Sequence, residues 1–141
     1  SFPKNIVPLA MQVAAGQREF IELRKHDNTE DKTAHRSFVH VMDVCSAVSL
    51  SLQWLYYQNQ AYEIFIFLGE ICSIQQLLGV VSKVTNVVIP TIDANYFEGE
   101  ELSQVGASSE KIQRMFNWKA QKTIEQMIED EWQFYQKQLN A

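Results

Sequence analysis

Cysteine, proline and glycine are scarce in this 141-residue chain, with two, three and five copies. The two cysteines, Cys45 and Cys72, lie among apolar residues and far from any C-x-x-C spacing. We expect them to be small core residues in a reducing compartment, because this pattern argues against a disulfide or a zinc site. No internal repeat or low-complexity tract is present.

Membrane-length apolar runs and basic clusters are also missing. The stretch Val41–Leu55 is interrupted by Asp43, three serines and Gln53, so it is too polar to span a membrane. Lysine and arginine total 12 against 17 acidic residues, which gives a net charge of -5 and argues against a nucleic-acid partner. No signal peptide is recognised, and we expect a cytoplasmic protein.

The composition that is present, 46% hydrophobic and 21% charged, predicts one globular domain over residues 1–141 with a single core. The sequence starts with Ser-Phe-Pro and no methionine. That start indicates a domain of a longer protein or a processed chain.

Apolar residues recur at helical spacing in five segments. The predicted helices run from Pro8 to about Ala15, from Asp43 to about Gln58, from Ser73 to Asn86, from Ser108 or Ser109 to Phe116, and from Thr123 to near the end. Two of them begin with a capping box, in which Ser73 or Thr123 stands three residues before a glutamine.

Four segments have the composition of strands, namely Phe20–Leu23, Phe38–Val41, Ala61–Leu68 and Val87–Ile92. The third is nearly all apolar and rich in β-branched and aromatic residues, which predicts a central, buried strand. The order α-β-β-α-β-α-β-α-α predicts a mixed α/β layer, with a small sheet of about four short strands covered by about five helices.

The stretch Asp31–Asp43 places one cation, Arg36, at the mouth of a predicted strand, and Asp43 can cap the helix that follows. An open α/β sheet presents groups to a ligand at such strand ends. A metal site built from His35, His40 and Asp43 is disfavoured, because the odd separation of the histidines puts them on opposite faces of an extended segment.

The same stretch, D-K-T-A-H-R-S-F-V-H-V-M-D, resembles the T-x-x-R-D-Y-I-H-V-x-D-L run of UDP-glucose 4-epimerases, in the NAD-dependent epimerase/dehydratase family of extended short-chain dehydrogenases/reductases. Further blocks resemble the family in the same order, at Pro3–Pro8, Val13–Glu19, Phe65–Ser73, Val81–Thr85, Ala107–Ile112 with Asn117–Lys119, and Thr123–Trp132. The resemblance covers almost the whole chain and implies the C-terminal, substrate-binding portion of an extended Rossmann-type enzyme.

Carried over position by position, the resemblance implies that Asn5 and Ile6 contact the pyrophosphate or uracil side of a UDP-sugar. Glu22 stands on the strand that offers backbone groups to the uracil. Arg36 would pair with the diphosphate, because a planar guanidinium suits phosphate oxygens better than a point charge does. Phe38 stands for the aromatic beside that arginine.

The resemblance also implies that Glu101, or its neighbour Glu100, holds the ribose hydroxyls. The chain departs from the family here, because Phe97–Glu101 lacks a second phosphate-binding arginine. The glycine-rich loop is shortened to Leu68–Cys72, and Arg24 replaces the aromatic on the uracil strand. An acidic loop beside a diphosphate repels it, so these departures favour weak nucleotide binding.

No catalytic residue is predicted in this chain. It has no G-x-x-G-x-x-G turn, and none of its five tyrosines precedes a lysine by four residues, so hydride transfer by this chain alone is excluded. The resemblance implies NAD in the intact family enzyme, no cofactor bound by this domain alone, and an NAD-binding N-terminal half as partner.

The sequence therefore predicts the domain of a UDP-glucose 4-epimerase-like isomerase that anchors the UDP moiety while an NAD-binding half does the redox chemistry. Two alternatives stay open: a catalytically inactive remnant acting as a protein-interaction module, or a domain of a related nucleotide-sugar dehydratase or reductase. Without the other half, an apolar face is expected to be exposed, which makes a homodimer a further prediction.

Overall fold

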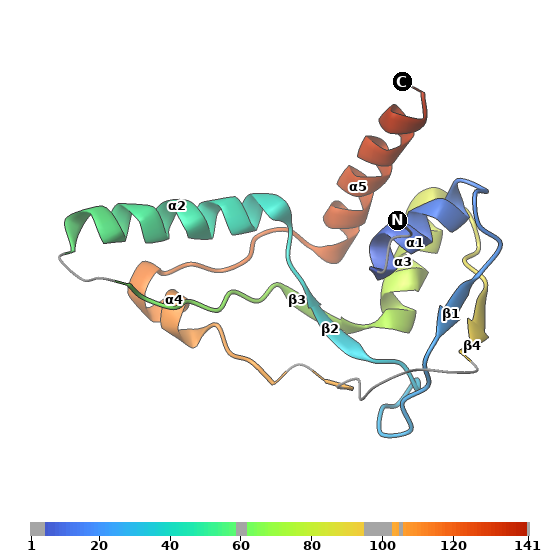
Figure 1. Cartoon of the computed structure of the whole chain (residues 1–141), viewed down its shortest axis with the longest axis horizontal. Helices are drawn as coiled ribbons and strands as arrows, with labels where there is room; N and C mark the ends of the chain where they lie inside the picture. Colours follow the sequence, from blue (N-terminus) through green and yellow to red (C-terminus); the bar gives the residue numbers. More distant parts are fainter. Residues whose placement is uncertain (1–4, 59–61, 95–102, 105, 141) are drawn as a thin grey trace.

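The computed structural model of the chain describes residues 5–58, 62–94, 103–104 and 106–140. This described part has the predicted mixed α/β fold, with five helices and four short strands (Figure 1). The helices are α1 (Ile6–Ala14), α2 (Val41–Tyr57), α3 (Ile74–Thr85), α4 (Glu110–Phe116) and α5 (Ile124–Leu139). The strands are β1 (Ile21–Leu23), β2 (His35–Phe38), β3 (Glu70–Ser73) and β4 (Thr91–Asp93).

The strands form two separate pairs among the described residues. β1 lies parallel to β4, with Ile21 opposite Thr91, and β2 lies antiparallel to β3, with Arg36 opposite Cys72. β4 occupies only the end of the predicted segment Val87–Ile92, because the ladder begins directly after Pro90, which has no N–H to donate.

The main core lies where α1, α3 and α5 pack against one another, with Ile21 of β1 buried among them. Its fully buried side chains include Met11, Ile21, Leu77, Val81 and Ile128. Each helix contributes apolar residues at a spacing of three or four, so one stripe of each is removed from water while the opposite side stays polar. This burial fixes α1 against β1, and the candidate site lies between these two elements.

A second, smaller cluster contains the buried residues Ala47, Ile112 and Trp118, with Phe65 and Phe67 packed against them. These residues belong to α2, to residues 62–69 and to the region around α4. Figure 1 shows this part extending away from the main core. We call it the α2–α4 arm.

Both predicted capping boxes are present. The Ser73 Oγ accepts from the Gln76 N–H at 3.1 Å, and the Gln76 side chain accepts from the Ser73 N–H at 2.9 Å. Thr123 and Gln126 make the same reciprocal pair at 3.2 and 3.1 Å. These bonds satisfy backbone N–H groups that have no partner inside the helix, which explains why α3 and α5 begin where they do.

The prediction that Asp43 caps the long helix is wrong. α2 begins at Val41, and its N-cap is His40, whose Nδ1 accepts from the Met42 N–H at 3.0 Å. Asp43 is instead buried in the first turn and accepts from the N–H groups of Gln121 and Lys122 at 3.1 and 2.9 Å. The error follows from β2, which ends three residues earlier than the predicted strand.

The prediction of a central, buried strand over Ala61–Leu68 is also wrong. Residue 61 lies outside the described residues, and residues 62–69 form no ladder with another described segment. Ile64 and Ile66 are exposed, and the strand of this region is β3, which begins at Glu70. The apolar composition correctly predicted an extended segment. It could not show that, in the described part of the chain, no other element covers the side that carries Ile64 and Ile66.

Candidate functional site

A small hollow lies where the start of α1 meets β1 and the turn that leads into β2. Its volume is about 150 Å³. It is lined by Ile6, Leu9, Ile21, Glu22, Leu23, Arg24, His26, Thr33, Ala34 and Ile74. It adjoins the carboxyl end of a strand in a parallel pair, the position where open α/β sheets bind ligands. We call it the α1–β1 hollow.

Two residues predicted to contact a nucleotide, Ile6 and Glu22, both line the α1–β1 hollow. Asn5 directly precedes Ile6 as the N-cap residue of α1, and its side chain makes no capping hydrogen bond. Asn5 and Glu22 are exposed, so a ligand in the hollow can reach both. The fold therefore brings together residues that are 16 positions apart in the sequence, from Ile6 to Glu22.

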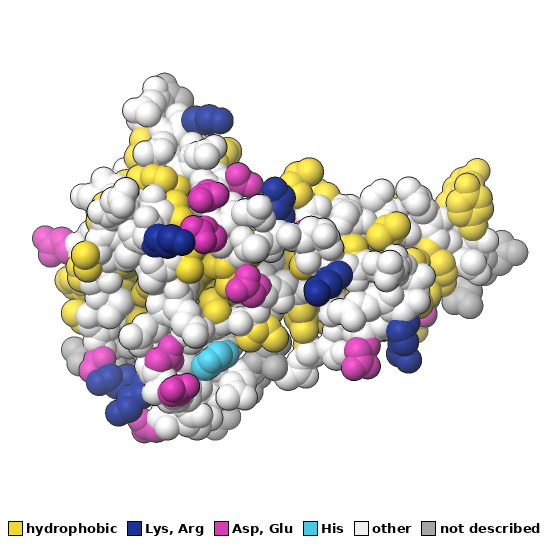
Figure 2. All heavy atoms as spheres, turned by 180° about the vertical axis from the view of Figure 1, so that it is seen from behind, with side chains coloured by type: hydrophobic (Ala, Val, Ile, Leu, Met, Phe, Trp, Pro, Cys, Tyr) yellow, Lys and Arg dark blue, Asp and Glu magenta, His cyan; other side chains and the backbone are white. Residues whose placement is uncertain are grey.

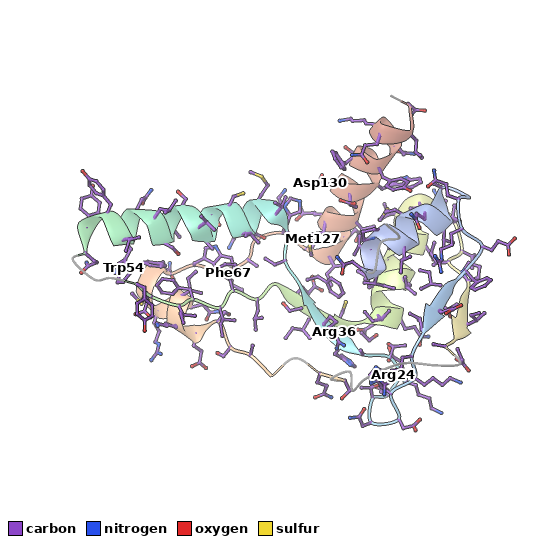
Figure 3. All side chains as sticks on the ribbon, viewed as in Figure 1. Arg24, Arg36, Trp54, Phe67, Met127 and Asp130 are labelled. Atoms are coloured by element: carbon purple, nitrogen blue, oxygen red, sulfur yellow. The ribbon has the colours of Figure 1, made fainter. Side chains whose placement is uncertain are left out.

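Arg36 lies on β2, two residues after Ala34, which lines the α1–β1 hollow. Its side chain is half-buried, and its Nη1 donates to the His35 carbonyl at 2.9 Å. Figure 3 shows Arg36 and Arg24 in the lower part of the molecule, on β2 and just past β1. Arg36 itself is not among the residues that line the hollow.

The turn before β2 is held in place by Asp31. Its carboxylate accepts from the Thr33 N–H at 3.0 Å, from the Thr33 hydroxyl at 2.8 Å, and from the Ser73 hydroxyl. Burial raises the pKa of Asp31, but the hydrogen bonds from Ser73 and Thr33 lower it by more, so the pKa lies below its ordinary value of 3.8. These bonds connect the turn to the start of α3 and so fix where β2 begins.

A second hollow, of about 350 Å³, lies on the other side of the same turn. Three cations line it, Arg24, Lys25 and Lys32, together with the carboxylates of Asp31 and Asp93. Lys25 pairs with Asp93 at 2.5 Å, and Asp31 is engaged by the hydroxyl groups described above. Arg24 lines both hollows, so it stands between them.

Sequence reasoning missed this gathering of positive charge. It treated Arg24 only as the loss of an aromatic side chain, and it did not connect Arg24 with Lys32. The adjacent cations Arg24 and Lys25, directly after a predicted strand, were the signal that could have indicated it.

Phe38 lies in a different place from the α1–β1 hollow. It lines a larger, mostly apolar hollow of about 600 Å³ between the end of β2, the start of α2 and α5. Met127 and Ile128 line the same hollow, with Asp130 and Glu131 among the few charged residues there. The structure therefore places Phe38 beside α5, where its ring packs against the main core.

His40 connects the start of α2 with α5 beside this larger hollow. Because its Nδ1 accepts the Met42 N–H, its Nε2 carries the proton and donates to the Asp130 carboxylate at 3.1 Å. Figure 3 shows Asp130 and Met127 on α5, near the start of α2. This bond gives His40 a structural role as the cap of α2 and a tether to α5.

Glu101 and its neighbour Glu100 lie outside the described residues. The segment that follows them returns to β2, because the Ser103 carbonyl accepts from the His35 N–H at 2.7 Å. The Ser103 hydroxyl also accepts from the Asn28 side chain at 2.8 Å.

Metal-binding clusters and membrane-spanning helices are both absent from the residues that the structure describes. No group of three or more histidine, cysteine, aspartate or glutamate side chains is placed to hold a metal ion there. Among the same residues, no helix is both long and apolar enough to cross a membrane.

Comparison with known proteins gives the family. The family model described as GDP-mannose 4,6 dehydratase matches residues 1–131. The chain belongs to the GDP-mannose 4,6-dehydratase family. This family assignment agrees with the resemblance drawn from the motifs.

Curated relatives of this GDP-mannose 4,6-dehydratase family member include UDP-glucose 4-epimerases. The enzyme of Halalkalibacterium halodurans is 32% identical over 133 residues, which are 93% of this chain and 40% of that protein. UDP-glucose 4-epimerase 2 of Arabidopsis thaliana is 32% identical over 132 residues, 92% of this chain and 37% of that protein. The chain thus spans about 40% of the length of the curated relatives it matches.

Solved structures agree. UDP-glucose-4-epimerase from Stenotrophomonas maltophila, with bound NAD and formylated UDP-arabinopyranose, has a TM-score of 0.89 at 28% identity and covers 99% of this chain and 41% of that chain. The Bifidobacterium longum enzyme, at 20% identity and a TM-score of 0.88, shows the fold alone. Together these comparisons confirm the predicted likeness to the C-terminal portion of the epimerases and the mixed α/β fold.

Proposed function

We propose that this chain binds the UDP moiety of a UDP-sugar as part of a UDP-glucose 4-epimerase-like isomerase, and that an NAD-binding portion outside the chain carries out the redox chemistry. Membership of the family and the likeness to an epimerase holding NAD and a UDP-sugar support this proposal. Asn5, Ile6, Glu22 and Arg36 are the residues that we assign to the nucleotide.

The observation that carries the proposal is the α1–β1 hollow. Ile6 lies in the Pro3–Pro8 block and Glu22 on the strand likened to the uracil strand, and both line this one hollow at the carboxyl end of β1. In this proposal Ile6 offers an apolar surface to a uracil ring, while the backbone of Glu22, an exposed residue of β1, bonds to the polar edge of the ring. Asn5, directly before α1, adds a side-chain amide beside helix N–H groups, and an anion is stabilised at such a helix start.

Arg36 and Arg24 are the groups that we assign to the diphosphate. Arg36 stands on β2, next to a turn that Asp31 and Thr33 hold rigidly, so its backbone is positioned before a ligand arrives. Arg24 stands between the α1–β1 hollow and the hollow that Lys32 lines. Two guanidinium groups, one on β2 and one directly after β1, can bind adjacent phosphates with charge-assisted hydrogen bonds. In this proposal Arg24 replaces the second arginine that the acidic run at residues 97–101 lacks.

The residues of this chain do not fit NAD, because the sequence has neither the glycine-rich turn nor the tyrosine–lysine pair. The chain's own contribution is therefore to bind and orient. By holding the UDP at its base and phosphates, it leaves the sugar as the part of the substrate that is free to turn. Anchoring through remote groups raises the effective concentration of the reacting sugar at a catalytic centre.

Isothermal titration of UDP into the 141-residue chain tests the proposal. Arg36→Ala removes at least one hydrogen bond to a charged group, worth about 1.5–3 kcal/mol, so we expect affinity to fall at least about 10- to 150-fold. Arg114→Ala removes an exposed arginine on α4, far from the hollow along the chain, and should bind UDP as the unchanged chain does. Equal affinity of Arg36→Ala and the unchanged chain would remove Arg36 from the site.

Arg24→Phe restores the aromatic of the family pattern and tests the second arginine separately. We expect it to weaken UDP more than uridine, because only UDP carries the phosphates. Equal loss for both ligands would assign Arg24 to the base and not to the diphosphate.

A second candidate function, a protein-interaction module without nucleotide binding, is favoured by the exposed apolar side chains of the α2–α4 arm, such as Leu52 and Ile64. Absence of any UDP or UDP-glucose binding by the folded chain would select this candidate.

A further inference from the structure

The second hollow, of about 350 Å³, is bounded by the turn that follows β1, by β4 and by α3. We call it the cationic hollow, because three cations, Arg24, Lys25 and Lys32, line it together with the two carboxylates of Asp31 and Asp93. Figure 2, which views the molecule from behind, shows side chains of both charge signs gathered at its lower left, where the turn and β4 lie. A cavity of this volume is at the lower limit of those that hold small molecules, so it suits a ligand smaller than a nucleotide.

The two carboxylates of the cationic hollow already have partners. Asp93 forms an ion pair with Lys25 at 2.5 Å. Asp31 accepts the hydrogen bonds from the turn and from the start of α3 that are described above. Lys32, by contrast, forms no ion pair with any residue that the structure describes. The positive charge of Lys32 is therefore left for an anionic ligand, in a chain whose net charge is -5.

The backbone of Lys32 adopts a conformation that a lysine disfavours. Its φ angle is 60°, in the left-handed region, where a Cβ lies too close to the backbone. The other non-glycine residues with positive φ in the described part of the chain are Asn86 and Asn117, which end α3 and α4 and belong to a residue type that tolerates this region. Strained backbone of this kind is concentrated at ligand-binding sites, so the strain at Lys32 points to a function for its side chain.

Hydrogen bonds within the turn hold Lys32 in this conformation. The His26 N–H donates to the Lys32 carbonyl at 2.9 Å, and the Lys32 N–H donates to the Thr29 carbonyl at 3.2 Å. The Thr29 hydroxyl donates to the His26 carbonyl at 3.0 Å and closes the turn. The backbone of Lys32 is therefore positioned before a ligand arrives, which lowers the entropy cost of binding.

We propose that the cationic hollow binds the phosphate group of a small molecule, at a site separate from the one that we assign to UDP. The ammonium group of Lys32 and the guanidinium of Arg24 suit a doubly charged phosphate better than a singly charged carboxylate. The hydroxyl groups of Ser82 and Thr91, which also line the hollow, can donate to the remaining phosphate oxygens. Lys32 does not line the α1–β1 hollow, so the two sites can be tested apart.

Amide chemical-shift mapping of the labelled 141-residue chain, during a titration with inorganic phosphate at pH 8, tests this proposal. The ionic strength is held constant with chloride, because salt screens exposed charges. We expect saturable shifts that are largest at Lys32, Ser82 and Thr91. Lys32→Gln removes a charge-assisted hydrogen bond, so the affinity for phosphate should fall at least about tenfold. Lys137→Gln is the matched control, because it removes the same charge from an exposed position near the end of α5 and should bind phosphate as the unchanged chain does.

Lys32→Gly separates binding from folding. Glycine adopts a positive φ without steric cost, so this variant should stay folded by circular dichroism and lose the same affinity for phosphate as Lys32→Gln. Its affinity for UDP should not change.

No saturable shift in the unchanged chain, or equal phosphate affinity of Lys32→Gln and Lys137→Gln, would overturn the proposal. Loss of both phosphate and UDP in Lys32→Gly would assign Lys32 to the UDP site and overturn a separate site. Glucose 6-phosphate in a parallel titration distinguishes the two sources of the phosphate group: tighter binding than that of inorganic phosphate identifies an organic monoester, and weaker binding identifies the free ion.

Discussion

The buried carboxylate of Asp43 gives the sharpest stability prediction. Asp43 is 5% exposed and accepts from two backbone N–H groups, those of Gln121 and Lys122, at 3.1 and 2.9 Å. Asp43→Ala removes the acceptor and leaves two N–H donors without their partner. Each hydrogen bond to a charged group is worth about 1.5–3 kcal/mol, so for the two bonds we expect a loss of about 3–6 kcal/mol in the free energy of unfolding.

For a chain of this length, each kcal/mol lowers the melting temperature by about 2–4 °C, so Asp43→Ala should melt roughly 6–24 °C lower than the unchanged chain. Calorimetry or thermal circular dichroism measures this shift. Asp43→Asn keeps one oxygen acceptor and should lose less. Asp27→Ala, at an exposed aspartate in the turn before β2, is the control and should melt as the unchanged chain does. A melting temperature for Asp43→Ala within 2 °C of the control would refute the idea that Asp43 holds this segment, given the scaling above.

Three further predictions concern single side chains. Burial raises the pKa of the Cys72 thiol to about 11, so a thiol reagent at pH 8 should modify the exposed Cys45 first; equal rates would contradict the burial of Cys72. The lowered pKa of Asp31 means that its carboxylate stabilises the fold above pH 3.8 and that this contribution disappears as pH falls through the lowered value. Asp31→Asn should therefore be less stable than the unchanged chain at pH 7, and the difference in stability should vanish in acid. A difference that does not change with pH would contradict this prediction. A Cβ at Gly69 would lie 1.8 Å from the Phe38 carbonyl oxygen, whereas a Cβ at Gly79 meets nothing within 4 Å and raises the helix propensity of α3. Gly69→Ala should therefore unfold at a lower urea concentration than Gly79→Ala. The reverse order in a urea titration would be inconsistent with the close approach at Gly69.

Local signals in the sequence predicted the ends of elements well. The capping boxes at Ser73 and Thr123 are present, and Asn86, the predicted end of a helix, has the left-handed conformation that ends α3. These features depend on residues three or four apart, so the sequence alone contains them. The start of α1 was predicted less accurately, because the helix begins at Ile6 and not at Pro8.

Long-range relations were less predictable. The hydrogen bond from Ser73 to Asp31 joins residues 42 positions apart, and it connects the turn before β2 to the start of α3. No periodicity in the sequence encodes that contact. The apolar composition of residues 61–68 predicted burial in the same way, but burial requires a covering element, and the described residues supply none on the side of Ile64 and Ile66.

The candidate site shows the same division. Ile6 and Glu22 were found through the family resemblance and line one hollow, whereas the approach of Arg24 and Lys32 depends on a turn whose path was not predictable. The role of each residue toward a nucleotide remains a prediction, and the UDP titration of Arg36→Ala is its simplest test.

The most direct test of nucleotide anchoring is the location of the UDP site by amide chemical-shift mapping of the labelled chain during a UDP titration. The proposed function predicts the largest shifts at Ile6, Glu22 and Arg36, with saturation at one affinity. Shifts confined to the α2–α4 arm, or no shifts at saturating UDP, would contradict it.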